Sequence, residues 1–300
     1  MNRLKGIAAV MFSAIIYGSV PFFAKSIYSL GGNPITLTFM RGLFSLPLLY
    51  FLARKFNVGT MKITLEELRK LLILVLGGYA ITAILLYASY VFIPTGIATT
   101  LHFSYPIFVV LGFMVFYGEK PTPAVTAALV LSFVGMLFFN DTDARINLPG
   151  FVMALGSGVT YGFFIIYVKK SGLNQMNLIK LTFYLALGAT VTFLFFGLLT
   201  RSLTLHIQPM GWLLTVLAAN LVALGGVYLF QLGIRIVGPQ RTAILSTFEP
   251  ITSILIGTLV FEEVLNLRIF SGILLILSSV VIIALDENRH LKKSLPPKNL

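Results

Sequence analysis

Long apolar stretches alternate with short polar connections along almost the whole chain. An α-helix rises about 1.5 Å per residue, so about 20 apolar residues cross the ~30 Å hydrocarbon core of a bilayer. The connections leave no room for a soluble domain. The pattern therefore predicts an all-α membrane protein with ten transmembrane helices, at about residues 5–25, 33–54, 69–90, 95–117, 122–139, 148–168, 178–199, 210–233, 239–261 and 268–285.

Composition agrees with a membrane environment. Hydrophobic residues make up 57% of the chain and charged residues 11%, against about 25% charged residues in an ordinary soluble domain. The first stretch follows Arg3 and Lys5 as a signal peptide would, but its partner in the repeat described next is internal, so we expect it to be a retained span. With no cysteine and no Walker motif in the sequence, we expect neither a metal nor a cofactor.

The chain repeats itself at an offset of 144 residues. Tyr17-Gly18 falls on Tyr161-Gly162, and Leu37-Thr38-Phe39 falls on Leu181-Thr182-Phe183. The register holds from the first to the fourth apolar stretch of each half, which indicates a duplicated unit. We predict one five-helix unit at residues 1–144, a second at 145–288 and a basic tail at 289–300.

The basic residues are distributed unevenly between the connections. With the N-terminus inside, seventeen Lys and Arg residues fall on the inner side and four on the outer side, with Arg41 left inside a span. This bias predicts a protein of the cytoplasmic (inner) membrane with both termini in the cytoplasm. The net charge of +12 is then explained by topology and by contact with lipid headgroups, and no nucleic-acid partner is expected. Because each unit has five spans, the second unit is inverted relative to the first. In such folds the substrate site lies near the midplane, between the halves.

Two segments and two shorter motifs carry a resemblance to a known family. Tyr105-Pro106 followed by Glu119, and Glu249-Pro250 followed by Glu263, resemble the proline and glutamate of the fourth and ninth spans of EamA-domain transporters in the drug/metabolite transporter superfamily. Tyr17-Gly18-Ser19 and Phe39-Met40-Arg41 resemble first- and second-span motifs of this family. The resemblance implies a ten-span transporter of small metabolites, often an exporter of amino acids or related solutes.

A polar stripe marks the ninth span. Thr242, Ser246, Glu249 and Ser253 recur at helical spacing, with Glu249 close to mid-membrane. The fourth span carries His102 and Tyr105 where the ninth has Ser246 and Glu249, and we expect the two stripes to face each other. Burial favours the neutral form of a carboxyl group, so Glu249 is a candidate for proton coupling or for binding a cationic group of the substrate. The alternative is a permanent structural partner for Glu249.

Arg41 lies within the second span, on a stripe with Thr38 and Ser45. Its guanidinium group is suited to clamp a substrate carboxylate. It is equally suited to fix the second span to Glu249 or to backbone carbonyls. If both charges face one cavity, they match the two ends of a zwitterion.

Other residues are candidates for gates or for the cavity wall. Glu119 and Glu263 end matching spans at opposite faces of the membrane, where each is either a gate or a boundary charge. Lys25 and Lys169 are best explained as lysines that reach the membrane interface. Pro106 and Pro250 break matching spans, as a hinge or as a passive kink. Candidates for the cavity wall are Tyr17, Tyr161, Tyr79, Tyr87, Asn220 and Gln231.

Three classes of function fit a membrane protein of this kind. An enzyme would need a catalytic constellation, but His102, His206 and His290 are scattered and no span holds an aspartate. A receptor or structural protein needs neither the duplication nor a mid-membrane glutamate. We therefore predict a secondary transporter that moves a small organic solute by alternating access. We expect it to be a monomer or homodimer, with protons and lipids as further partners. An uncoupled facilitator or exchanger is the alternative.

Overall fold

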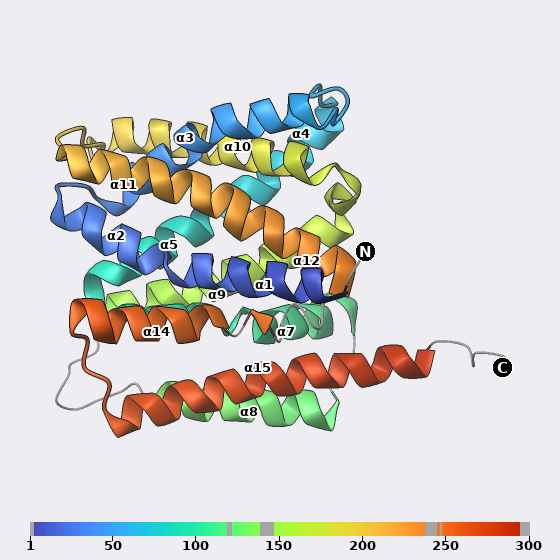
Figure 1. The fold of residues 1–300 in the computed structure, drawn as a ribbon. Helices are drawn as coiled ribbons and strands as arrows, with labels where there is room; N and C mark the ends of the chain where they lie inside the picture. Colours follow the sequence, from blue (N-terminus) through green and yellow to red (C-terminus); the bar gives the residue numbers. More distant parts are fainter. Residues whose placement is uncertain (1–2, 119–121, 139–146, 238–244, 247, 295–300) are drawn as a thin grey trace.

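The computed structural model describes residues 3–118, 122–138, 147–237, 245–246 and 248–294, and the regular elements in them are all helical (Figure 1). An apolar helix stands at each of the ten predicted positions. Seven are long enough to cross a bilayer, and three are shorter within the described residues, at Thr126–Gly135, Phe248–Phe261 and Leu267–Ser279. The structure thus confirms an all-helical protein built for a membrane. Ten complete crossings stay a prediction.

Several predicted spans consist of more than one helical segment. The first half contains α1 (Arg3–Gly18), α2 (Val20–Ser29), α3 (Pro34–Lys55), α4 (Leu65–Leu74), the π-helix η1 (Val75–Tyr79), α5 (Ala80–Phe92), α6 (Thr95–His102), α7 (Tyr105–Tyr117) and α8 (Pro123–Leu137). The second half contains α9 (Leu148–Lys170), the short η2 (Leu173–Gln175), α10 (Leu178–Leu199), α11 (Pro209–Asn220), the π-helix η3 (Leu221–Tyr228), α12 (Leu229–Val237), α14 (Phe248–Phe261) and α15 (Leu267–Ser294).

Local sequence explains many of the helix boundaries. Asn33 and Asn177, which match in the repeat, accept hydrogen bonds from Thr36 N at 2.8 Å and Ile179 N at 2.9 Å, and so cap α3 and α10. The first span breaks at Ser19, two residues before Pro21, and the fourth breaks shortly before Pro106. At the other end of the chain, α15 continues to Ser294, so the helix extends into the segment that the sequence assigned to a tail.

The contacts between helices follow a two-fold pattern. The second and seventh spans (α3 and α10) pack together, as do the fifth and tenth (α8 and α15) and the fourth and ninth (α6 and α14). The first span (α1) contacts the eighth (α12), and the sixth (α9) contacts the third (α5). Exchanging the two halves leaves this set of contacts unchanged. The halves are therefore related as an axis of two-fold pseudosymmetry would relate them.

Both described ends of the chain lie on the same edge of the bundle, where α1 begins and α15 ends (Figure 1). This arrangement requires an even number of crossings. Large apolar side chains project from the helices, including Phe116 at 78% exposure and Phe195 at 61% exposure. Exposed apolar surface on this scale suits contact with lipid rather than with water.

Candidate functional site

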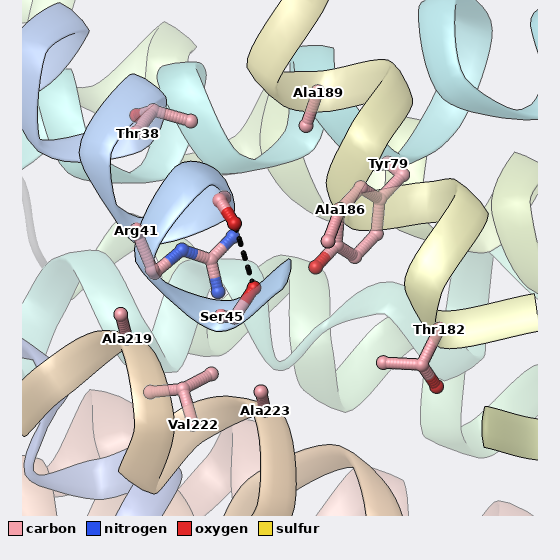
Figure 2. A pocket seen from close by; sticks show the side chains of 11 residues that line it. Thr38, Arg41, Ser45, Tyr79, Thr182, Ala186, Ala189, Ala219, Val222 and Ala223 are labelled. Carbon is pink, nitrogen blue, oxygen red and sulfur yellow. Dashed lines mark hydrogen bonds between the residues drawn. The ribbon is translucent and has the colours of Figure 1, made fainter. Parts of the chain in front are cut away.

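A small pocket lies where α3, α10 and the junction of α11 with η3 meet (Figure 2). Its free volume is about 10 Å³, roughly the room that one water molecule needs. The residues that line it are Thr38, Arg41, Gly42, Ser45, Tyr79, Thr182, Ala186, Ala189, Ala219, Val222 and Ala223. Figure 2 shows the guanidinium group of Arg41 and the hydroxyl group of Tyr79 turned toward the space between the helices.

Most of the pocket consists of pairs of residues that match at the 144-residue offset. The matched pairs in the wall are Thr38 with Thr182, Gly42 with Ala186, Ser45 with Ala189, and Tyr79 with Ala223. The pocket therefore lies between equivalent parts of the two halves, where the pseudosymmetry axis passes. Its chemistry is not symmetric, because the first half supplies a charge and hydroxyl groups where the second half supplies mainly methyl groups.

Arg41 is the charged residue of the pocket wall, and the matching residue of the second half is Leu185. The carbon Cζ of its guanidinium group lies 5.4 Å from the ring centre of Tyr87 and 5.9 Å from that of Tyr79. These distances fit cation–π contacts. Its Nε is buried without a hydrogen-bond partner, and no carboxylate of the described residues pairs with the side chain. The proposed fixation of the second span to Glu249 by an ion pair is thus not what the described residues show.

Non-standard helical turns flank the pocket on both sides. Tyr79 ends η1, whereas Val222 and Ala223 lie in η3, and the two π-helical segments belong to the equivalent third and eighth spans. The glycine pairs of these spans, Gly77-Gly78 and Gly225-Gly226, fall within the π-helices. π-Helical turns are rare and occur frequently at functional sites.

Serine residues at equivalent positions of the first and sixth spans bridge to other spans. Ser13 donates to the carbonyl oxygen of Gly226 in η3 at 2.7 Å, and Ser157 lies 3.0 Å from Nδ1 of His102 in α6. Tyr17 and Tyr161 follow these serines by one helical turn. The first and sixth spans are therefore fixed to the interior of the bundle by side chains that match in the repeat.

An aromatic cluster lies next to Tyr161. The ring centre of Tyr161 is 4.8 Å from that of Tyr105, 5.3 Å from that of His102 and 5.6 Å from that of Phe164. Phe164 in turn contacts Tyr79 at 6.0 Å. Adjacent rings therefore lead from His102 and Tyr105 in the fourth span to the wall of the Arg41 pocket.

Glu249 is the second residue of α14, immediately after the break in the ninth span. Its backbone N–H donates to the carbonyl oxygen of Ser246 at 2.9 Å. In the part of the chain that the structure describes, the carboxylate forms no ion pair. Tyr17 and Tyr87 are near enough to both Glu249 and Arg41 to interact with them electrostatically.

The fourth and ninth spans are in direct contact, as the sequence led us to expect. Thr99 Oγ1 lies 2.9 Å from Ser253 Oγ, which is fully buried. The ninth-span stripe thus contributes one hydrogen bond to the interface between the halves. Thr242 lies outside the described residues.

Lys25 of α2 pairs with Glu263, which follows the end of α14. Figure 1 shows that α14 ends at the edge of the bundle opposite both termini. Lys25 Nζ lies 2.5 Å from Glu263 Oε1, and the Lys25 ammonium group also lies 5.0 Å from the ring centre of Phe261. The same carboxylate accepts hydrogen bonds from Thr95 N at 2.9 Å and from Thr95 Oγ1 at 2.9 and 3.0 Å. One carboxylate therefore connects α2, the first residue of α6 and the end of α14.

The remaining predicted residues have less direct roles in this geometry. Asn220 donates to Val216 O in its own helix at 2.9 Å and does not line the described pocket. Pro250 and Ser246 are buried at the start of the ninth-span helix. Gln231 and Pro106 lie in α12 and α7, but their side chains are outside the described part of the structure, as is all of Glu119.

Sequence reasoning missed several residues of these sites. Thr95 at the Lys25–Glu263 contact is an ordinary threonine at the start of a span. Thr182 was visible only as the match of Thr38, and the sequence pattern did not single out the alanines of the pocket wall. The spacing of Ala186 with Ala189, and of Ala219 with Ala223, was a usable signal, because small residues one turn apart leave room beside a helix. In the described residues, no group of three or more His, Asp or Glu side chains is placed to hold a metal ion.

Comparison with known proteins agrees with this architecture. The model of the EamA-like transporter family matches the chain twice, at residues 4–140 and 148–285, so the two matches begin 144 residues apart. An uncharacterized transporter of Archaeoglobus fulgidus is 27% identical over 286 residues, which cover 92% of this chain and 95% of the relative. The uncharacterized inner membrane transporter YicL of Salmonella typhimurium is 26% identical over 64% of this chain and 65% of its own length.

A solved protein structure also has this fold. It superposes with a TM-score of 0.64 over 96% of this chain and 99% of its own chain, at 14% sequence identity. At this identity the likeness concerns the fold alone.

Proposed function

Because the chain belongs to the EamA-like transporter family of the drug/metabolite transporter superfamily and is a multi-pass membrane protein, we propose that it is a secondary transporter that exports an amino acid or a related small metabolite by alternating access. The transported solute binds between the two halves, near the midplane, where a two-fold axis brings equivalent helices together. Rocking of one half against the other then exposes this site to each face in turn.

The observation that carries this proposal is the Lys25–Glu263 contact, which lies on one face of the bundle. Inside the bundle, Arg41 and Glu249 form no ion pair with any described residue. By the charge distribution, the face that holds Lys25 and Glu263 is the outer one. The ion pair joins α2 of the first half to the end of α14 in the second half, and the same carboxylate caps α6. Such a contact between halves holds the outer ends of these helices together, and its rupture is the step that opens the site to the outside.

Glu249 supplies the coupling in this proposal. The carboxyl group lies on the first turn of α14, where the positive end of the helix dipole stabilises a negative charge. Since no ion pair of the described residues holds it, the group is free to exchange a proton or to bind the ammonium group of an amino acid. Tyr17 and Tyr87, which interact electrostatically with both Glu249 and Arg41, would form part of the wall along which such a solute extends.

Flux into liposomes that contain the purified protein tests the proposal. Radiolabelled amino acids and biogenic amines are supplied one at a time, with and without an imposed pH gradient. At least one solute is expected to accumulate faster than in protein-free liposomes, and the gradient is expected to raise its accumulation. The absence of flux for every solute contradicts transport, whereas flux that ignores the gradient contradicts only the proton coupling and leaves a facilitator.

A further inference from the structure

We propose that the Arg41 pocket binds the carboxylate of the transported solute, so that the protein selects carboxylic acids over the corresponding amines and amides. This inference rests on the proposed transport function and names the chemical class of its substrate. It starts from a charge in the interior that lacks a counter-charge among the described residues.

A guanidinium group that is partly withdrawn from solvent, with no carboxylate partner among the described residues, is costly at membrane depth. Tyr79 and Tyr87 offset part of this cost through their ring faces, at 5.9 and 5.4 Å from Cζ. The side chain of Tyr79 also accepts a hydrogen bond from the guanidinium group. Nε is buried without a hydrogen-bond partner. The Nε side of the group is thus available for a carboxylate, whose charge and planar geometry match a guanidinium group.

The composition of the pocket wall favours a monoanion. Arg41 is the single charged residue among the lining residues described, so one negative charge is balanced there. The hydroxyl groups of Tyr79 and Ser45 lie beside it, although Ser45 Oγ already donates to Gly42 O at 2.8 Å. Opposite them, Ala186, Ala189 and Ala223 present methyl groups. A phosphate dianion would need a second cation in the wall. A carboxylate attached to a small apolar group fits a wall with one cation on one side and methyl groups on the other.

The position of the pocket connects binding to movement. Its walls come from α3 and α10, which are equivalent helices of the two halves, and from η1 and η3, the π-helical segments of equivalent spans. A carboxylate held by Arg41 of the first half therefore lies against the alanine wall of the second half. Any displacement of the halves along each other changes both contacts at once.

Competition experiments on the wild-type protein test the inference. An amino acid that moves in the flux assay is kept as the labelled solute, and its carboxamide, its decarboxylated amine and inorganic phosphate are added as competitors. The unlabelled acid is expected to compete at least about tenfold more strongly than the amide or the amine, as loss of a charged hydrogen-bonded pair implies. Phosphate is expected not to compete. Equal competition by the amine or amide, or strong competition by phosphate, overturns the inference while transport itself stands.

Variants assign the selectivity to the residue. Arg41→Gln is expected to remove the preference for the acid while the amide still competes, and Arg41→Lys is expected to keep part of the preference because the charge remains without the planar fork. Arg54→Gln, near the exposed end of the same helix, is the matched control and should behave as wild type. A variant Arg41→Gln that still prefers the acid tenfold contradicts the inference. If Arg41→Gln does not fold, the wild-type competition series decides. Absence of flux for every solute would instead contradict the proposed function.

Discussion

At the scale of single residues, the interior of this protein holds two opposite charges that are not paired with each other. Arg41 lies against the rings of Tyr79 and Tyr87, and Glu249 lies at the start of α14. Tyr17 and Tyr87 interact with both. An ion pair between Arg41 and Glu249 would have satisfied both groups and closed the space between them.

Replacement of Glu249 by glutamine tests its role in coupling. The amide has nearly the same shape but cannot bind or release a proton, so we expect flux in Glu249→Gln to lose its dependence on the pH gradient while downhill exchange continues. Initial rates in proteoliposomes at several external pH values measure this effect. Glu66→Gln, at an exposed carboxylate, is the control and should keep the wild-type profile. An unchanged pH response in Glu249→Gln would sink the coupling role.

Gly18 illustrates how closely the first and ninth spans approach. A Cβ atom at this position would lie 2.5 Å from the carbonyl oxygen of Glu249 and 2.6 Å from Cβ of Thr252. We therefore expect Gly18→Ala to push α1 away from α14, at about 1–3 kcal/mol, and to lower the apparent melting temperature in detergent. Gly156→Ala is the matched control, because its Cβ would meet Leu85 Cδ1 at an ordinary 3.5 Å. Equal melting temperatures for the two variants would contradict this packing.

At the scale of helical elements, the spans nearest the site are interrupted. The fourth span breaks between α6 and α7, and the third and eighth contain η1 and η3. Each interruption frees backbone groups that need another partner. Ser13 supplies such a partner to Gly226 O in η3, from a different span. The interrupted spans are thus stabilised by their neighbours, which couples their shape to the packing between the halves.

The Lys25–Glu263 contact predicts how the outer face opens. Ser253 is fully buried beneath it and bonds to Thr99, so a cysteine there is expected to react slowly with a membrane-impermeant maleimide added outside. Glu263→Gln breaks a partly buried ion pair, a loss of up to about 3–5 kcal/mol, and should speed this labelling at least about tenfold. The chain has no native cysteine to interfere.

The neighbouring Glu262→Gln is the matched control for this experiment, since its side chain is exposed and forms no ion pair within the described residues. It should leave the labelling rate of Ser253→Cys unchanged. If Glu263→Gln labels no faster than Glu262→Gln, the contact does not hold the outer face closed.

At the scale of the whole molecule, the repeat accounts for the arrangement of the helices. The family model matches twice, and the contacts between helices are preserved when the halves are exchanged. Even the connections repeat, since Asn57 after α3 and Arg201 after α10 both have positive φ angles, of 47° and 53°. Their shared left-handed conformation ends equivalent helices in the same way.

Equivalent positions on opposite sides of the membrane test the inversion. Phe56 and Thr200 match in the repeat and are the exposed residues that follow α3 and α10. In intact cells we expect an impermeant maleimide to label Thr200→Cys and not Phe56→Cys, and disruption of the membrane should make the two equally reactive. Labelling of both from outside, or of Phe56→Cys alone, would refute the predicted topology.

The sequence predicted much of the architecture, because burial in lipid imposes long apolar stretches and because the duplication preserves its register. It also singled out Arg41 and Glu249 as charges within spans, whereas it assigned Lys25 to the membrane interface and left Glu263 as either a gate or a boundary charge. It did not predict that Lys25 pairs with Glu263, since residues 238 positions apart meet only through the packing of three helices. The pocket was equally hidden, because alanines and threonines such as Thr182 gain their significance only from facing a charged residue across the axis.

Alternating access means that one solute site faces each side of the membrane in turn, and counterflow is the measurement closest to this property. Proteoliposomes are loaded with an unlabelled amino acid that the flux assay identifies and are diluted into a trace of the same labelled compound. We expect a transient accumulation of label above equilibrium, because the returning carrier exchanges outgoing for incoming solute. Simple equilibration of the label, with no overshoot at any internal concentration, would contradict alternating access.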